Sequence, residues 1–246
     1  MTSNIPVIIL AGGLGTRISE ETTSKPKPMI LIGDKPILWH IINIYASQGF
    51  TNFIIATGYQ HQIIDNWIEE ISEKNSWGMN CAIRTIFTGE DTQTGGRIKQ
   101  ILENDINEIF MFTYGDGLAN VNVRKLLDFH FCHGRIATVT SVRPPARFGL
   151  IESKNGKVIN FGEKTQSDAG WINGGFFVIN RKTSQYILGD SESFEFSTMK
   201  KLVKDGQLMT KKHYGFWQPM DTLREKRMLE VAYNSTPAPW MDISTE

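Results

Sequence analysis

The chain has 246 residues, and its 26 lysines and arginines balance 26 aspartates and glutamates. This length is enough for one large α/β domain with a buried core, and it excludes a small scaffold held together by disulfide bonds. The neutral balance gives no whole-molecule field that would attract nucleic acid or an anionic membrane, so we expect neither as a partner.

The cysteines and the N-terminal segment bear on the compartment. The two cysteines, Cys81 and Cys132, are far apart in sequence, which favours free thiols in a reducing environment. The apolar stretch at 7–10 has no basic region before it and is too short for a signal peptide or a membrane span. We therefore expect a soluble, cytoplasmic protein.

Short apolar runs alternate with longer segments of helical periodicity over the first part of the chain. This alternation is typical of strand-helix-strand units on a mostly parallel sheet. The pattern therefore predicts an α/β fold with a Rossmann-like, mostly parallel mixed sheet flanked by helices. The expected strands are 6–10, 53–57, 81–87, 109–113 and 137–142. The expected helices are 36–48, 60–73, 95–104 and 123–133.

The character of the chain changes after about residue 143. Strand-like runs follow one another closely, and turn signals such as Asn155-Gly156 separate them. This favours a small mixed or antiparallel extension that forms a second wall of a cleft. The expected strands of this part are 150–153, 158–161 and 175–180, and the expected helices are 197–204 and 223–233, with 213–219 as the loop between them.

Three glycines follow the first strand, in the stretch AGGLGTRISEETTSKPKPM at 11–29. Gly12, Gly13 and Gly15 fall at the carboxyl end of that strand, where parallel sheets bind their ligands. Glycine permits a positive φ and lets backbone N–H groups approach an anion closely. A simple tight turn is the alternative, but a turn has no use for the cations that follow.

Three basic residues stand close to these glycines. Arg17, Lys25 and Lys27 lie within eleven residues of one another. Pro26 and Pro28 restrict the backbone on both sides of Lys27, so the lysine is held at a defined distance from the glycines. Held cations are what the developing charge on a phosphate requires. The loop therefore predicts a polyphosphate ligand.

Two familiar phosphate-binding motifs do not fit this loop. A dinucleotide fingerprint needs a third glycine at the position of Ile18. A P-loop needs Gly-Lys-Ser or Gly-Lys-Thr where the chain reads Gly15-Thr16-Arg17. The sequence therefore supports neither a nicotinamide enzyme nor a P-loop ATPase.

Two aspartates are candidates for a metal site. Asp116 follows the strand at 109–113 and stands between Gly115 and Gly117, where a carboxylate can approach Mg²⁺ and a phosphate. An aspartate in an ordinary turn is the alternative reading. Asp221 precedes the last predicted helix, so helix capping and metal binding are both open for it on sequence alone.

The motifs resemble the signature of the sugar-1-phosphate nucleotidylyltransferases, and most closely that of the glucose-1-phosphate cytidylyltransferases. The resemblance runs in the same order over nearly the whole chain, from about residue 5 to 240. The phrases that carry it are LAGGLGTR at 10–17, KPKP at 25–28, TGGR at 94–97, FTYGDG at 112–117, NGGFF at 173–177 and GFWQPMDTLR at 215–224.

The resemblance implies a nucleotidyltransferase fold and a chemistry. The enzyme would transfer a nucleotidyl group from a nucleoside triphosphate, CTP in the nearest relatives, to a sugar 1-phosphate, glucose 1-phosphate in those relatives, and release pyrophosphate. It also implies a single domain over 1–246, with about 5–142 as the nucleotide-binding half and about 143–240 as the sugar-phosphate half. A homo-oligomer is expected.

The resemblance also assigns roles to individual residues. Asp116 and Asp221 would hold Mg²⁺, and Arg17 and Lys27 would steady the triphosphate, which makes these four residues the expected catalytic set. The nucleotide would bind to Leu10, Ala11, Gly12, Gly13, Leu14, Gly15, Thr16, Arg17, Lys27, Thr92, Arg97 and Gly115. The sugar phosphate would bind to Gly149, Glu163, Lys164, Asn173 and Gly174.

Two departures from the family pattern leave alternatives open. Thr165 stands where relatives commonly have proline, beside the expected sugar-phosphate residues. The segment 71–92 is shorter than in the cytidylyltransferases, which leaves the base and the oligomeric state open. Thymidylyl, uridylyl or guanylyl transfer and a non-catalytic nucleotide-sugar-binding protein are the alternatives. A glycosyltransferase is less favoured, because the chain has no Asp-x-Asp motif around Asp116.

Overall fold

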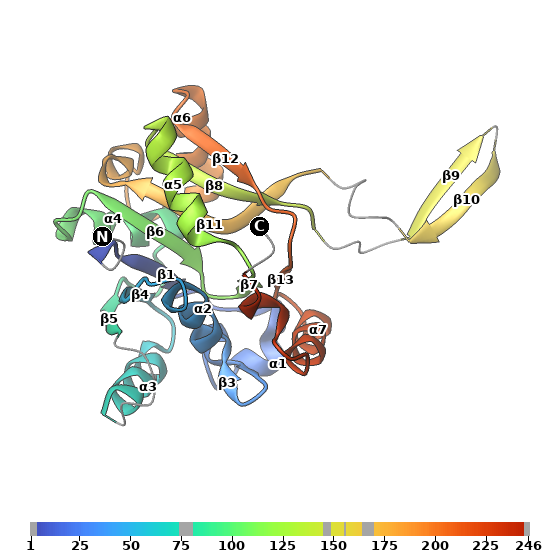
Figure 1. Ribbon diagram of the computed structural model, residues 1–246. Coiled ribbons are helices and arrows are strands. Elements are labelled where there is room, and N and C mark those ends of the chain that lie inside the picture. The colour runs from blue at the N-terminus through green and yellow to red at the C-terminus, as the bar shows by residue number, and fades with distance from the viewer. Residues whose placement is uncertain (1–3, 74–80, 145–148, 155, 164–169, 244–246) are drawn as a thin grey trace.

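The computed structural model describes residues 4–73, 81–144, 149–154, 156–163 and 170–243. A seven-stranded sheet with helices on both faces forms its centre (Figure 1). One strand, β11, runs antiparallel to both neighbours, and the other neighbouring pairs of this sheet are parallel. The predicted mostly parallel mixed sheet is confirmed. The strand order is β12 (Leu208–Lys212), β8 (Ala137–Val142), β11 (Ile172–Asn180), β6 (Ile109–Tyr114), β1 (Val7–Ala11), β4 (Asn52–Thr57) and β5 (Ala82–Phe87).

Helices cover both faces because alternate residues of each central strand point to opposite sides. On β1, Val7 and Ile9 belong to one buried cluster, whereas Ile8 and Leu10 belong to the other. The helices that cover the two faces, whose bounds are given below, overlap the predicted helices closely. No helix of the described residues is long and apolar enough to cross a membrane. The first cluster packs against α2 (Ile37–Ala46), α3 (His61–Glu73) and α5 (Val123–His133), and the second against α4 (Thr94–Asn104) and α6 (Met199–Lys204).

The carboxyl ends of β1 and β6 lie side by side, because the strands are parallel and Leu10 is paired with Tyr114. The Gly115 N–H donates to the backbone oxygen of Leu10 over 3.0 Å. A Cβ at position 115 would stand 2.8 Å from that oxygen, so only glycine fits the approach. The glycine loop, residues 10–17, and the turn that carries Asp116 therefore start next to each other.

A short ladder brings the C-terminal part of the chain to the same edge. β7 (Gly117–Ala119) pairs antiparallel with β13 (Trp217–Pro219). The Met220 N–H then donates to the backbone oxygen of Asp116 over 2.8 Å. Asp116 and Asp221 meet for this reason, although they are far apart in sequence. The loop predicted at 213–219 is wrong at its end, because a three-residue strand closed by proline carries no strand signal.

The C-terminal third contains two further differences from the expectation. The helix predicted at 197–204 begins with one π-helical turn, η6 (Phe194–Thr198), before α6 starts. β12 was not predicted, because this edge strand is mostly exposed or half-buried and has no continuous apolar run. The last helix, α7 (Leu223–Tyr233), has the predicted bounds. The shorter elements are η2 (Thr16–Ile18), α1 (Ser19–Thr22), η3 (Lys27–Met29), β2 (Leu31–Ile32), β3 (Lys35–Pro36), η5 (Arg181–Tyr186) and η7 (Pro239–Met241).

The small antiparallel extension is a two-stranded hairpin, β9 (Gly149–Lys154) and β10 (Lys157–Glu163). Figure 1 shows the hairpin standing apart from the seven-stranded sheet. The third strand expected in this extension, at 175–180, lies instead within the main sheet as part of β11. Its burial explains the difference, since the strand is enclosed between β6 and β8.

Candidate active site

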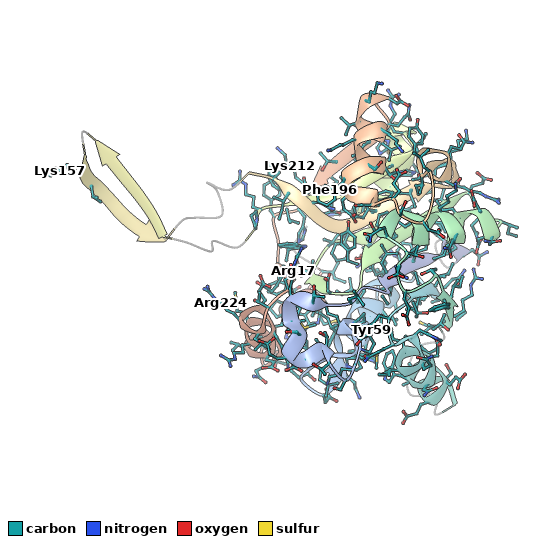
Figure 2. All side chains as sticks on the ribbon, turned by 180° about the vertical axis from the view of Figure 1, so that it is seen from behind. Arg17, Tyr59, Lys157, Phe196, Lys212 and Arg224 are labelled. Atoms are coloured by element: carbon teal, nitrogen blue, oxygen red, sulfur yellow. The ribbon has the colours of Figure 1, made fainter. Side chains whose placement is uncertain are left out.

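A cleft of about 800 Å³ opens at the carboxyl edge of the sheet. The glycine loop forms one side, and η6 and the start of β11 form the other. In Figure 2, Arg17 and Phe196 lie on opposite sides of this opening. The predicted residues that line it are Leu10, Gly12, Gly13, Leu14, Gly15, Thr16, Arg17, Lys27, Thr92, Arg97, Gly115, Asp116, Asn173, Gly174 and Asp221. Ala11 differs from these, because it is buried in the first core cluster.

The ammonium of Lys27 lies between the two aspartates. Its Nζ is 2.7 Å from Asp116 Oδ2 and 2.8 Å from Asp221 Oδ1. The lysine side chain is only 12% exposed, so these contacts form in a partly desolvated place. Burial alone would lower the pKa of Lys27, but the carboxylates of Asp116 and Asp221 outweigh it and raise that pKa above its usual value. Lys27 is therefore a held cation within a dicarboxylate pair.

Arg17 extends this charged group toward solvent. Its Nη1 lies 3.3 Å from Asp221 Oδ2, and its side chain is 77% exposed. An ion pair this exposed contributes little stability, so it leaves the guanidinium available to an anion in the cleft. The backbone order places Arg17 in η2, directly after the glycines.

The glycine loop owes its course to specific close approaches. Gly15 has a φ of 64°, in the left-handed region that favours glycine, and a Cβ there would stand 2.8 Å from Thr22 Cγ2. Gly12 is enclosed by the guanidinium of Arg97, which a Cβ would strike. Gly13 has open space around it and is exposed toward the cleft. Two of the three glycines are thus required by geometry, and the third faces the opening.

The guanidinium of Arg97 is held by hydrogen bonds to the protein itself. The residue borders the cleft, yet it is only 4% exposed. Its terminal nitrogens donate to backbone oxygens of Gly12, Thr57 and Glu90 and to the Thr88 hydroxyl. Thr92 lines the same part of the cleft.

The predicted sugar-phosphate residues divide into two groups. Asn173 and Gly174 lie in the cleft, where the Trp217 indole N–H donates to the backbone oxygen of Gly174 over 2.8 Å. Gly149 and Glu163 are paired residues in the antiparallel register of β9 and β10. Lys164 lies outside the described residues.

The cleft also contains an acidic side chain that the sequence motifs do not predict, Glu195. Its Oε1 accepts from the Tyr114 hydroxyl over 2.6 Å, and its Oε2 accepts from the Thr94 hydroxyl over 2.7 Å. The Asn173 amide donates to the same Tyr114 hydroxyl over 3.1 Å. Burial and the Glu195 carboxylate raise the pKa of Tyr114 well above its usual value, so the hydroxyl stays protonated. The position of Tyr114 at the end of a buried strand was the one sequence feature that indicated a polar partner in this part of the cleft.

The carboxylate oxygens of Asp116 and Asp221 are ligands of the kind that a hard divalent cation such as Mg²⁺ prefers. No group of three or more His, Cys, Asp or Glu side chains among the described residues could hold a metal ion. Mg²⁺ needs only one or two protein carboxylates when phosphate and water supply the remaining oxygens. Asp116 and Asp221 already hold one cation between them, the Lys27 ammonium, so the pair is arranged for a positive charge.

Comparisons with known proteins identify the family of this chain. A model of the nucleotidyl transferase family matches residues 6–245. Glucose-1-phosphate cytidylyltransferases of Salmonella typhimurium and Salmonella typhi are each 42% identical over 252 residues, which cover 95% of this chain and 97% of the relative. The crystal structure of HddC from Yersinia pseudotuberculosis complexed with GMP-PN has a TM-score of 0.73 at 22% identity, covers 94% of this chain and 100% of that chain, and shows the shared fold. The chain therefore belongs to the nucleotidyl transferase family and, within it, to the sugar-1-phosphate nucleotidylyltransferases.

Proposed function

We propose that this protein transfers the cytidylyl group of CTP to glucose 1-phosphate, giving CDP-glucose and pyrophosphate. Relatives with this activity in their names are 42% identical over nearly the whole chain. The observation that carries the proposal is the position of Lys27 between Asp116 and Asp221, in a cleft that the glycine loop borders. Enzymes of this family act on a nucleoside triphosphate and a sugar phosphate.

We propose that the two substrates occupy different sides of the cleft. We assign the nucleotide to the glycine loop 10–17 and to the side that contains Thr92, Arg97 and Gly115. We assign the sugar to the side of Asn173 and Gly174, with Gly149, Glu163 and Lys164 supplying further contacts from the neighbouring segment. In this division residues 5–142 provide the nucleotide half and 143–240 the sugar-phosphate half of one domain.

Asp116 and Asp221 are the residues that would hold the metal. The family generally uses a divalent ion, and we propose Mg²⁺, since two carboxylates and phosphate oxygens are the ligands that it prefers. When bound, the ion would neutralise charge on the triphosphate and polarise its α-phosphate.

The reaction in this proposal is one direct displacement. An oxygen of the sugar 1-phosphate forms a bond to the α-phosphorus of CTP, and the bond from that phosphorus to the bridging oxygen breaks. Pyrophosphate leaves with the electron pair. The attacking phosphate is already ionised at neutral pH, so the protein needs no general base. Lys27 and Arg17 hold charge on the triphosphate, and the two sides of the cleft align the reactants.

The proposal also includes a cellular compartment and an oligomeric state. A cytoplasmic enzyme agrees with Cys81 and Cys132, which are both free thiols in the structure. We also propose that the protein is a homo-oligomer, and the molar mass measured by light scattering on the purified protein tests this. A molar mass equal to that of one chain would refute the homo-oligomer but would leave the proposed reaction unaffected.

Pyrophosphate release with a panel of substrates tests the function. The protein is incubated with Mg²⁺, one of CTP, dTTP, UTP or GTP, and one of several sugar 1-phosphates. We expect the highest kcat/KM for CTP with glucose 1-phosphate. A higher value for another triphosphate would move the assignment to that base, and tight binding without pyrophosphate release would favour a non-catalytic binding protein.

A further inference from the structure

The guanidinium of Arg97 is a buried cation behind the glycine loop. Arg97 belongs to α4 and is only 4% exposed. No ion pair joins it to a carboxylate of the described residues, and burial lowers the pKa of the guanidinium below its usual value. A charge buried without a counter-ion is costly unless hydrogen bonds satisfy it. Its hydrogen bonds must therefore account for its place.

The terminal nitrogens of Arg97 are fully used by the protein. Nη1 donates to the Thr57 backbone oxygen over 2.9 Å and to the Thr88 hydroxyl over 2.6 Å. Nη2 donates to the backbone oxygens of Gly12 over 2.9 Å and Glu90 over 3.2 Å. A guanidinium has five N–H groups, four of them on these two nitrogens. The terminal nitrogens thus have no N–H left to donate to a nucleotide.

The surroundings of the guanidinium are shaped to receive it. A Cβ on Gly12 would strike the guanidinium, and a Cβ on Gly58 would stand 2.7 Å from Nη1 and 2.7 Å from the Gly12 oxygen. The Tyr59 N–H also donates to the Gly12 oxygen over 3.3 Å. The guanidinium therefore lies in a narrow space between the glycine loop and the turn that follows β4. Glycine is needed on both sides of this space, at Gly12 and at Gly58.

We propose that Arg97 is a positioning residue that acts through the glycine loop rather than through its own bonds to the nucleotide. The guanidinium ties Gly12 to the ends of β4 and β5, so the loop that receives the triphosphate is held in place before the substrate arrives. The inference rests on the proposed function, because it takes this loop as the triphosphate site.

The test compares Arg97→Met and Thr88→Val with a matched control. Thr88→Val removes one acceptor of the guanidinium at a residue that does not line the cleft. Thr183→Val is the control, because Thr183 is equally buried but its hydroxyl has no hydrogen-bond partner among the described residues. Hydrogen exchange is followed by mass spectrometry in peptides that contain 11–18 and 57–61, without substrates. Steady-state kinetics then give kcat and KM for the triphosphate.

We expect faster exchange in both peptides for Thr88→Val, by about tenfold, which is the effect of one lost hydrogen bond. Its kcat/KM for the triphosphate falls in parallel. In Arg97→Met both effects are larger, and kcat/KM falls about 10²-fold, as for other misplaced reactants. Thr183→Val changes neither. If Arg97→Met fails to fold, Thr88→Val alone carries the comparison.

Two results would overturn the inference. Unchanged exchange in both variants, with lower triphosphate affinity in Arg97→Met alone, would make Arg97 a direct ligand of the nucleotide. Faster exchange with unchanged kinetics would reduce it to a structural residue. Because exchange is measured without substrates, a wild-type protein that releases no pyrophosphate would refute the proposed function separately.

Discussion

Nζ of Lys27 lies 2.7 Å from Oδ2 of Asp116, across 89 positions of the sequence. Parallel pairing of β1 with β6 brings the two loops to one edge, and the turn η3 presents the lysine there. The β7–β13 ladder adds Asp221 from the C-terminal part of the chain. One cation and two carboxylates thus occupy the place where a triphosphate and its metal are expected to meet.

Removing the ammonium should open the carboxylate pair to metal. In the free protein we expect Lys27→Met to bind Mn²⁺ more tightly than wild type by at least about tenfold, since close charge pairs couple by roughly this much or more. Turnover should fall at the same time, because the triphosphate loses a held cation. Electron paramagnetic resonance of free Mn²⁺ measures the binding without activity.

Lys35→Met is the matched control for this metal titration. Lys35 pairs with Asp34 at 3.4 Å on an exposed hairpin, away from the cleft. We expect the control to bind Mn²⁺ as wild type does. Equal Mn²⁺ affinity in Lys27→Met and wild type would show that the lysine does not compete with metal for Asp116 and Asp221.

The positive φ of Gly15 predicts a stability effect. Gly15→Ala would place a Cβ against Thr22 in a left-handed backbone, so we expect the free energy of unfolding to fall by about 1–3 kcal/mol. Gly13→Ala serves as the control, because its Cβ meets open space and its φ is not positive. Urea denaturation measures both. Equal stabilities for the two variants would refute the argument.

The network around Tyr114 predicts an effect on the sugar side. Tyr114→Phe leaves Glu195 and Asn173 without the hydroxyl that joins them. We expect KM for the sugar phosphate to rise about tenfold, the effect of one hydrogen bond, with a smaller change in KM for the triphosphate. Tyr186→Phe is the control, since the Tyr186 hydroxyl pairs with Asp205 outside the cleft. An equal rise in both KM values would argue against this assignment.

The alternation of apolar runs with segments of helical periodicity predicted the mostly parallel sheet, and the family resemblance predicted that Lys27, Asp116 and Asp221 belong to one catalytic set. Sequence reasoning missed Glu195, which reaches the cleft only because the π-helical turn η6 packs against the start of α4. No residue pattern in 192–198 reveals that packing. It also could not show that the bonds of Arg97 are made to the protein, since the acceptors are mostly backbone oxygens of distant segments.

His130 predicts how stability depends on pH. Burial and the neighbouring His133 lower the pKa of His130 from 6.5 to about 4, while its Nδ1 hydrogen-bonds the Thr138 hydroxyl. The unfolded chain therefore takes up a proton more readily, so the stability contributed by neutral His130 is present above pH 6.5 and is lost as the pH falls toward 4. The loss can reach about 3 kcal/mol.

Urea denaturation at pH 7 and pH 4.5 measures this dependence. We expect His130→Gln to be less stable than wild type at pH 7, since a well-packed buried group is replaced. The difference should shrink at pH 4.5, where wild type has lost its advantage. A constant difference between the two proteins would contradict the assigned pKa of His130.

The rate of Mg²⁺-dependent pyrophosphate release by Asp116→Asn tests the account most directly. The control is Asp128→Asn, the same substitution on the exposed side of α5. With CTP and glucose 1-phosphate, we predict a loss of about 10²–10³-fold in Asp116→Asn, as for other preorganised electrostatic groups, and a wild-type rate in Asp128→Asn. A near-normal rate in Asp116→Asn would remove the dicarboxylate pair from the chemistry and contradict the account.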